Sequence, residues 1–503
     1  MSTRKLNGPL GGEYLIDGTG NAILMADSPI TDDNRLGARL TTAEAAIALT
    51  EPQMRAGRAL EGLLRPRLPL AYPYQTAALT SDTPTVTHSL SATITSNYFG
   101  ISAGEKGIAY EGLSYVAPVW NATYSFWDHR ERGITGGGSV QSTMNSVAFT
   151  LIGDTVEIDW RVWTTEAVIW IWVDGKPISV QPVAPSGVTL SANIACYTKL
   201  VFGSAGVRTI QFQLDWGQVR NFRVPNSGSI MPAVGLGPKV YGIGDSILEA
   251  STGNFTHWSS WGPIVARSAG WRFYNAGQGG SGYTTDGASG QKLTTLTSRP
   301  QNIVLVDPDL AVFFIGVNDA AVDAATLTAA VASVFAYLNT NAPNVPIVVV
   351  GGAPTSAASI FLTTARVQSR KAIRDGVLAY PNVIGFIDPV GDADTGTTPS
   401  ALTNGTTYAV GDRYTYLGAL WEVTEAHTAT ATPTYKSVKR LTWLYGTGLA
   451  GGATGNGNRD VLLSNDGVHP TQAGQNAYAA WIAQGVANCI QHWLKTGQRL
   501  GLS

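Results

Sequence analysis

One stretch, Lys239-Val240-Tyr241-Gly242-Ile243-Gly244-Asp245-Ser246, joins an apolar run to a short polar turn. The run from 239 to 244 predicts a strand buried on both faces, as the strands of parallel sheets are. Ser246 would then emerge at the carboxyl end of that strand, where open α/β sheets bind their ligands. The stretch therefore predicts a parallel sheet with a reactive hydroxyl at its edge.

Apolar runs and helical patterns alternate from here to the C-terminus. Further strands are expected near 271–275, 310–315, 346–351 and 383–387, and helices near 256–269, 324–340, 357–379 and 471–494. Alternating strands and helices indicate a doubly wound parallel sheet in three α/β/α layers. We therefore predict an α/β/α domain over residues 239–503.

Three further blocks follow the serine, namely Asn275–Gly280, Gly316–Asp319 and Asp466–His469. Acyl transfer by a serine needs a base, a carboxylate that orients the base, and donors for the oxyanion. His469 is the expected base, because it alone among the six histidines has an aspartate three residues earlier. Asp466 would hold its Nδ1.

The oxyanion donors expected from these blocks are the backbone N–H groups of Ser246 and Gly280 and the side-chain amide of Asn318. In content and order the four blocks resemble the SGNH hydrolases, also called GDSL esterases and lipases, over residues 239–495. That resemblance implies a flavodoxin-like sheet and the same five site residues. It also implies an insertion, because the separation of Asn318 from Asp466 is longer than usual in the family.

Four more residues near the site are expected to contact the substrate: Gln278, Tyr283, Val317 and Trp421. The glycines of 277–282 also fit the Gly-x-Gly-x-x-Gly pattern of dinucleotide sites. No helix is predicted directly after them and no acidic residue stands at the ribose position, so we expect no cofactor. Asp388, Asp392 and Asp394 lack the spacing of a calcium loop, and we expect no metal.

Before this domain, residues 79–228 carry short strand-like runs separated by turns, which predicts a β-sandwich of jelly-roll type with a possible carbohydrate-binding role. The run 168–173 is apolar at every position, so it should be covered on both faces. Most of the tryptophans Trp120, Trp127, Trp160, Trp163, Trp170, Trp172 and Trp216 should be core, with one or two exposed for binding. Residues 226–238 are expected to be a linker.

Two more segments are predicted to act as accessories. Residues 1–78 should contain a helix over 41–64 whose apolar residues dock on a partner or on a second copy, the alternative being a partly disordered leader. The insertion over 396–458 resembles the small aromatic modules of phage fibres and polysaccharide enzymes. We expect it to form a wall or lid of the site, or else to pack Tyr414, Tyr416 and Trp421 in a small core of its own.

Length and composition set limits on the class of protein. With 503 residues the chain should hold two or three domains. A net charge of −2 gives no reason to expect nucleic acid or an anionic membrane as partner. The two cysteines fall in different predicted domains, so no disulfide is expected. No apolar run has the length of a membrane span, and no signal peptide is recognised at the start.

A β-sandwich joined to an SGNH domain resembles two-domain carbohydrate esterases and the deacetylating spikes of bacteriophages. The resemblance implies a serine esterase that removes O-acetyl groups from a bacterial surface polysaccharide. We expect a virion or extracellular location, contacts with other virion proteins through residues 1–78, and a homo-oligomer, a trimer. Two alternatives stay open, namely an adhesin without turnover and a lipase or thioesterase with the same site.

Overall fold

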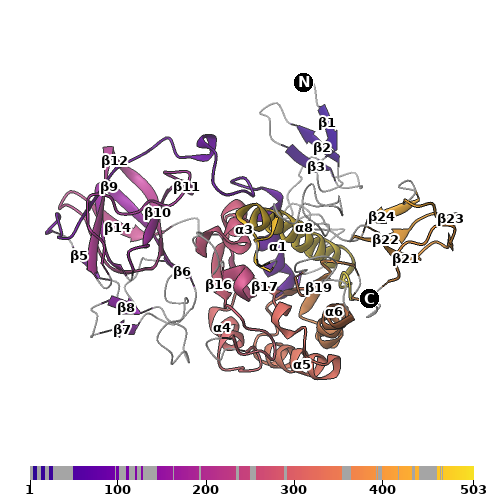
Figure 1. Cartoon of the computed structure of the whole chain (residues 1–503). Coiled ribbons are helices and arrows are strands. Elements are labelled where there is room, and N and C mark those ends of the chain that lie inside the picture. The colour runs from indigo at the N-terminus through magenta and orange to yellow at the C-terminus, as the bar shows by residue number, and fades with distance from the viewer. Residues whose placement is uncertain are drawn as a thin grey trace.

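The computed structural model describes residues 4–7, 13–16, 22–25, 49–96, 98–100, 109–112, 119–121, 126–128, 144–162, 164–191, 194–233, 237–249, 257–287, 292–353, 364–391, 393–394, 399–416, 419–432, 437–440, 462–464, 466 and 468–502. A parallel sheet with its helices lies between a larger antiparallel β unit and a small β module (Figure 1). Among the described helices, none combines the length and the apolar character needed to cross a membrane.

A five-stranded parallel sheet forms the centre of the second half of the chain. Its strand order is β16-β15-β17-β18-β19, with bounds Arg272–Gly277, Lys239–Gly244, Leu310–Phe314, Ile347–Val350 and Val383–Ile387. All four strand pairs are parallel. The α/β sheet predicted from the alternating pattern is confirmed, and we call this part of the molecule the α/β unit.

Helices cover both faces of the sheet because neighbouring residues of each strand point to opposite sides. One face packs on α1, α3 and α8, with bounds Glu51–Leu64, Trp261–Ala269 and Gln472–Thr496. The other face packs on α4, α5 and α6, with bounds Arg299–Val306, Ala324–Asn341 and Thr364–Val377 (Figure 1). Helix α4 was not predicted, because it is short and has a proline as its second residue.

The β unit is built on two long antiparallel strands, β9 (Met144–Val162) and β12 (Ile194–Asp215). Their pairing shifts between Val201 and Gly206, and the segments on both sides of this shift contribute to one apolar core. The other strands of the sheet are β4 Thr85–Ser89, β5 Tyr98–Gly100, β6 Ala109–Gly112, β10 Val168–Val173, β11 Lys176–Pro177, β13 Gly217–Arg223 and β14 Ser229–Pro232. The jelly-roll topology stays a prediction. Strand β14 lies inside the expected linker, which is therefore partly structured.

Strand β10 is covered on both faces, as its uninterrupted apolar run predicts. Ile169, Ile171 and Val173 belong to the core of the β unit. Trp170 and Trp172 face the other way and cluster with Leu68, Tyr74 and Trp258. The Arg267 guanidinium of α3 lies 4.5 Å from the centre of the Trp170 ring. These two tryptophans therefore join the β unit to the α/β unit and present no open ring face to a sugar.

A buried ion pair also crosses this junction. His257, at the start of the short helix η4 (His257–Ser259), donates its backbone N–H to Asp215 Oδ2 at 2.7 Å. Its Nδ1 lies 2.5 Å from Asp215 Oδ1. The next residue, Trp258, donates its indole N–H to the Leu214 carbonyl at 2.9 Å. The end of β12 thus holds the segment that leads into α3.

Helix α1 does not leave its apolar side for a partner molecule. Ala56, Ala59 and Leu60 are buried in the core of the α/β unit, and the indole N–H of Trp271 donates to the Ala59 carbonyl at 3.0 Å. Arg55 and Arg58 pair with Asp307 and Asp309 just before β17. The docking expected for this helix is therefore intramolecular. Docking of residues 1–48 on a partner protein stays a prediction. In that segment the structure describes β1 Arg4–Asn7, β2 Glu13–Ile16 and β3 Ala22–Met25.

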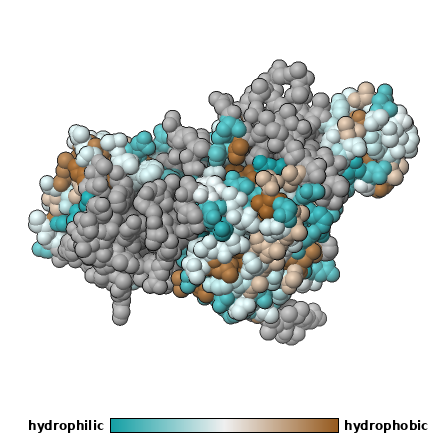
Figure 2. All heavy atoms as spheres, turned by 60° about the horizontal axis from the view of Figure 1, so that its bottom comes forward, coloured by the Kyte–Doolittle hydropathy of each residue, from teal (hydrophilic) through white to brown (hydrophobic). Residues whose placement is uncertain are grey.

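The remaining strands form small separate pairs and sheets. The insertion contains β20 Thr407–Tyr408, β21 Arg413–Tyr416, β22 Ala419–Val423, β23 His427–Thr428 and β24 Val438–Arg440, and β7 Val119–Asn121 pairs with β8 Phe126–Asp128. Large exposed apolar side chains are scattered over the described surface, and Figure 2 shows hydrophilic and hydrophobic residues interspersed on one face. The described surface therefore gives no sign of a broad apolar interface.

Candidate active site

Ser246 lies directly after β15 and begins the short helix α2 (Ser246–Glu249). Gly244, two residues earlier, has no room for a side chain, because an added Cβ would stand 2.4 Å from Cβ of Leu248. Asp245 accepts the Ile247 N–H through Oδ1 at 3.0 Å and so holds the turn. This local structure places the Ser246 hydroxyl at the carboxyl edge of the sheet, as the sequence predicts, although only 7% of the residue is exposed.

The structure brings His469 to Ser246 across 223 positions of sequence. His469 Nε2 lies 2.7 Å from Ser246 Oγ, and its Nδ1 lies 2.6 Å from Asp466 Oδ2. With Asp466 on Nδ1, the tautomer that fits both contacts carries its proton on Nδ1 and offers Nε2 as an acceptor. Ser246, His469 and Asp466 therefore form a continuous hydrogen-bonded chain that can remove a proton from the serine hydroxyl.

The Asp466 carboxylate is held by more than the histidine. Its Oδ1 accepts hydrogen bonds from the Ser464 hydroxyl at 2.6 Å and from the Val468 N–H at 2.8 Å. Burial alone would raise the pKa of Asp466, but the hydrogen bonds from Ser464, His469 and Val468 outweigh it and hold the pKa well below its ordinary value. The carboxylate stays charged and keeps the imidazole oriented.

Asp245 beside the nucleophile has the opposite electrostatic environment. It is 1% exposed, and burial raises its pKa to about 7 against the Ile247 hydrogen bond and the charges of His469 and Arg299. Asp245 and Asp466 are thus two carboxyl groups close to one serine, with pKa values displaced in opposite directions. Only Asp466 touches the histidine ring.

The loop after β16 is held in place by Arg299, the first residue of α4. Arg299 is fully buried and donates to the carbonyls of Gly244 and Ala276 at 2.7 and 3.1 Å and to the Ser281 hydroxyl at 2.9 Å. This guanidinium joins the ends of β15 and β16 to the glycine loop. Arg299 is not predicted from the sequence, because nothing in its surroundings resembles a motif.

The blocks that carry Gly280 and Asn318 are joined by a direct hydrogen bond. The Asn318 side-chain amide donates to the Ser281 carbonyl at 2.8 Å, which leaves its second N–H available. Gly280 is exposed and has a φ of 71°, a conformation that favours glycine. Asp319, also missed as a structural residue, accepts the Tyr283 N–H at 2.7 Å and the Thr285 N–H at 3.1 Å.

Substrate contacts were expected for Gln278, Tyr283, Val317 and Trp421. The first three have buried side chains. Tyr283 is fully buried in the core between the sheet and α4–α6, so the prediction that it contacts substrate is wrong. Gln278 and Val317 are 2% and 4% exposed, which leaves their side chains no substantial surface to offer. A position near a motif predicts a surface residue, but the loop folds inward and buries these side chains.

Trp421 belongs to the small core of the insertion. It is half-buried, packs against Tyr414, Val423 and Val438, and donates its indole N–H to the Tyr416 carbonyl at 3.3 Å. The insertion joins the α/β unit through an ion pair between Arg413 and Asp394 at 2.7 Å. Trp421 therefore fits the second expectation, in which the insertion packs its aromatic residues in a small core of its own. That the insertion forms a wall or lid of the site stays a prediction. Residues 446–458, which lead back to the site, lie outside the described part.

The motifs weighed for cofactors and metals have other roles here. Among the described residues after the glycine loop, 283–287 and 292–298 contain no α-helix, and α4 begins at Arg299. Asp388 accepts the backbone N–H groups of Val390 and Ala393, and Asp394 pairs with Arg413. Asp392 lies outside the described residues.

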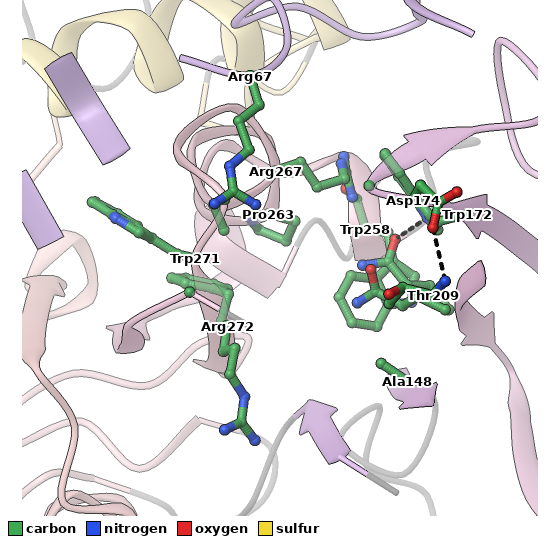
Figure 3. Close-up of a pocket in the computed structure, with 17 residues that line it drawn as sticks. Arg67, Ala148, Trp172, Asp174, Thr209, Trp258, Pro263, Arg267, Trp271 and Arg272 are labelled. Atoms are coloured by element: carbon green, nitrogen blue, oxygen red, sulfur yellow. Dashed lines mark hydrogen bonds between the residues drawn. The ribbon is translucent and has the colours of Figure 1, made fainter. Parts of the chain in front are cut away.

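A cavity of about 300 Å³ lies at the junction of the two units rather than at Ser246. Trp172, Asp174 and Thr209 of the β unit line one side, and the other side carries Arg67, Arg267 and Arg272 (Figure 3). None of Ser246, Asp466 and His469 lines it. Ser246 therefore lies at the sheet edge and outside the lining of this cavity.

A serine–histidine–aspartate chain at the carboxyl edge of a parallel α/β/α sheet defines a serine hydrolase. Residues 243–477 match the model of the GDSL-like Lipase/Acylhydrolase family. The matched part carries every residue of the site, so the predicted resemblance to these hydrolases is confirmed. A comparison with curated proteins gave no match.

Solved structures similar to this chain include several carbohydrate esterases. A family two carbohydrate esterase from Clostridium thermocellum has 16% identity and a TM-score of 0.45, covering 76% of this chain and 98% of its own. An enzyme of the same family from Corynascus thermopiles has 14% identity and a TM-score of 0.44, covering 76% and 100%. A putative GDSL-like lipase from Bacteroides ovatus has 18% identity and a TM-score of 0.40, covering 60% and 92%.

Proposed function

We propose that the protein is a serine esterase that works by two-step acyl transfer. The proposal rests on the contact between Ser246 Oγ and His469 Nε2 at 2.7 Å. His469 takes the hydroxyl proton as Oγ attacks the ester carbonyl, and then gives this proton to the leaving alcohol. Water, activated by the same imidazole, releases the acid from the acyl-enzyme.

In this proposal the oxyanion is stabilised by the backbone N–H groups of Ser246 and Gly280 and by the Asn318 amide. The hydrogen bond from Asn318 to Ser281 supports it, because that bond fixes the asparagine against the loop that carries Gly280. Fixed donors cost no reorganisation when charge develops on the substrate oxygen. Asp466 supplies the charge that stabilises the imidazolium.

The substrate we propose is an O-acetylated polysaccharide of a bacterial surface, and the setting a virion spike. Support comes from the sequence resemblance to two-domain carbohydrate esterases and phage deacetylases, and from the β unit beside the α/β unit. Contacts with other virion proteins through residues 1–48, a trimeric assembly and an extracellular or virion location belong to the same proposal. The low content of charged residues, 14%, is in keeping with it.

Acetate release from purified acetylated polysaccharides tests this function, with Ser246→Ala as the inactive control. Wild-type protein should release acetate and should react at Ser246 with a fluorophosphonate probe. Failure to label Ser246 would favour an adhesin without turnover. Acetyl and octanoyl nitrophenyl esters are then compared, because a preference for the long chain would favour a lipase or thioesterase instead.

A further inference from the structure

Arg366 stands at the same edge of the sheet as the catalytic serine. It belongs to the first turn of α6, the helix that lies between β18 and β19 in sequence. Strand β18 pairs with β17, which precedes Asn318, and β17 pairs with β15, which precedes Ser246. Three neighbouring strands therefore direct a serine, an asparagine and an arginine to one edge, where α/β sheets bind their ligands.

A hydrogen bond joins Arg366 to the segment that carries Asn318. Its Nη1 donates to the carbonyl of Val317, the residue directly before Asn318. The charge of Asp245, the residue directly before Ser246, acts on Arg366 as well. The side chain thus contacts the segment that supplies the amide donor and lies within electrostatic range of the residue before the nucleophile.

The positive charge of Arg366 has no ion-pair partner among the residues that the structure describes. No carboxylate in the described part of the chain lies within ion-pair distance of it, whereas Arg55, Arg208 and Arg413 each have one. The stretch Pro354–Thr364, which precedes it, contains no acidic residue. Arg370, one turn further along α6, adds a second positive charge.

A half-buried guanidinium, most of whose donors find no acceptor among the described residues, is suited to an anion. It has five N–H donors, of which the Val317 carbonyl takes one, and its planar shape matches a carboxylate. Burial raises the pKa of Asp245 to about 7, so near neutral pH that carboxyl is only partly charged and compensates Arg366 incompletely. An arriving anion would therefore meet a positive field beside the serine.

We propose that Arg366 forms an anion-binding subsite next to the oxyanion hole, which receives the carboxylate of an acidic sugar near the scissile ester. This inference rests on the proposed esterase function and names the substrate more closely, as the ester of a uronic acid polysaccharide. A carboxylate held there would orient the sugar so that its acetyl carbonyl faces Ser246. Charged hydrogen bonds of this kind contribute enough to give a preference of about 10-fold or more.

The test compares methyl glucoside with methyl glucuronoside, both acetylated at the same three ring hydroxyls. In wild-type protein kcat/KM should favour the glucuronoside by about 10-fold or more. In Arg366→Gln this ratio should fall toward one, and Arg366→Lys should keep part of it, because the charge remains without the planar fork. The matched control is Lys371→Gln on the same helix, whose lysine pairs with Asp375 and which should leave both rates unchanged.

Equal ratios in wild type and Arg366→Gln would overturn the inference while the esterase function stands. Equal losses on both esters would overturn it too, because Arg366 would then act only by holding Val317. If wild-type protein cleaves neither ester, the proposed function fails for these sugars. Calorimetric binding of the glucuronoside to Ser246→Ala, with and without Arg366→Gln, then decides the subsite alone: no difference between the two overturns it.

Discussion

Two histidine–aspartate pairs in this molecule have nearly the same geometry and different surroundings. In the first, His469 Nδ1 lies 2.6 Å from Asp466, and 45% of the aspartate side chain is exposed. In the second, His257 Nδ1 lies 2.5 Å from Asp215, and only 6% and 2% of the two side chains are exposed. The first pair lies at the sheet edge and the second at the junction of the two units.

The comparison shows that the pair itself does not make a catalytic site. The free ring nitrogen of His469 reaches a serine hydroxyl at an accessible edge, so a proton can be moved to and from a substrate. His257 packs beside Trp216 instead, and its aspartate also holds the His257 backbone N–H. The third partner and the access to solvent decide which pair can do chemistry and which one holds the fold.

Breaking the first pair should give the largest effect on activity. We expect Asp466→Asn to lower kcat by roughly 10³ to 10⁴, because the imidazole loses its orientation and the charge that stabilises it. The melting temperature should change little, since Asp466 is half exposed. Steady-state kinetics on a nitrophenyl acetate together with thermal unfolding check this. A large fall in stability with normal kcat would make Asp466 a structural residue like Asp215.

Breaking the second pair should show the reverse pattern. We expect Asp215→Asn to lower the free energy of unfolding by about 3 to 5 kcal/mol, because a buried charge loses its partner. Below the melting temperature kcat should stay within a few-fold of wild type. Urea unfolding measured beside the kinetics separates the two properties. Equal stability of variant and wild type would mean that the junction does not depend on this pair.

Removal of the oxyanion donor Asn318 should lower activity by an intermediate amount. We expect Asn318→Ala to lower kcat by about 10² to 10³ with a smaller change in KM, because the amide acts mainly in the transition state. Asn341→Ala, on the exposed end of α5, is a matched control whose asparagine donates only to its own helix. A change confined to KM would place Asn318 in substrate binding instead.

The smallest expected effect is a pH dependence of stability from the second pair. Burial alone would lower the pKa of His257, but the charge and hydrogen bond of Asp215 and the charge of Glu249 raise it above its ordinary value of 6.5. The folded protein then binds this proton more tightly than the unfolded chain does. Its stabilisation is complete below about pH 6.5 and is lost as the pH rises through the higher folded pKa.

Thermal unfolding of wild type and Asp215→Asn between pH 5 and 9 measures this contribution. The difference in melting temperature between them should be largest at low pH and should shrink as the pH rises. Other titrating groups, such as Asp245, act on both proteins alike and cancel in the difference. A gap that widens with rising pH would contradict the assigned direction of the His257 shift.

The same two pairs show which contacts can be predicted from the sequence and which cannot. Asp466 and His469 stand three residues apart within a recognisable block, so local spacing was enough to name them and the turn around them. Asp215 and His257 are 42 residues apart, at the end of one unit and the start of another, and no local pattern joins them. The parallel sheet and five of its helices were predicted, because periodicity is a local property of the chain.

Properties that depend on tertiary packing were not predictable from local pattern. Tyr283 lies next to a site motif and was expected to meet the substrate, yet the loop folds inward and buries it. The apolar side of α1 was assigned to a partner, because nothing local shows that α3 and α8 of the same chain cover it. Arg299 and Asp319 hold the site loops through contacts with segments far along the chain.

Helix α1 precedes the β unit in the chain but packs against helix α8 near the C-terminus. A ribosome therefore releases this helix long before the surface that receives it has been made, and the whole β unit emerges in between. During synthesis the β unit can fold first, while α1 remains unpacked. The core of the α/β unit is completed only after α8 has been synthesised. Deletion of either α1 or α8 would thus leave the same core uncovered.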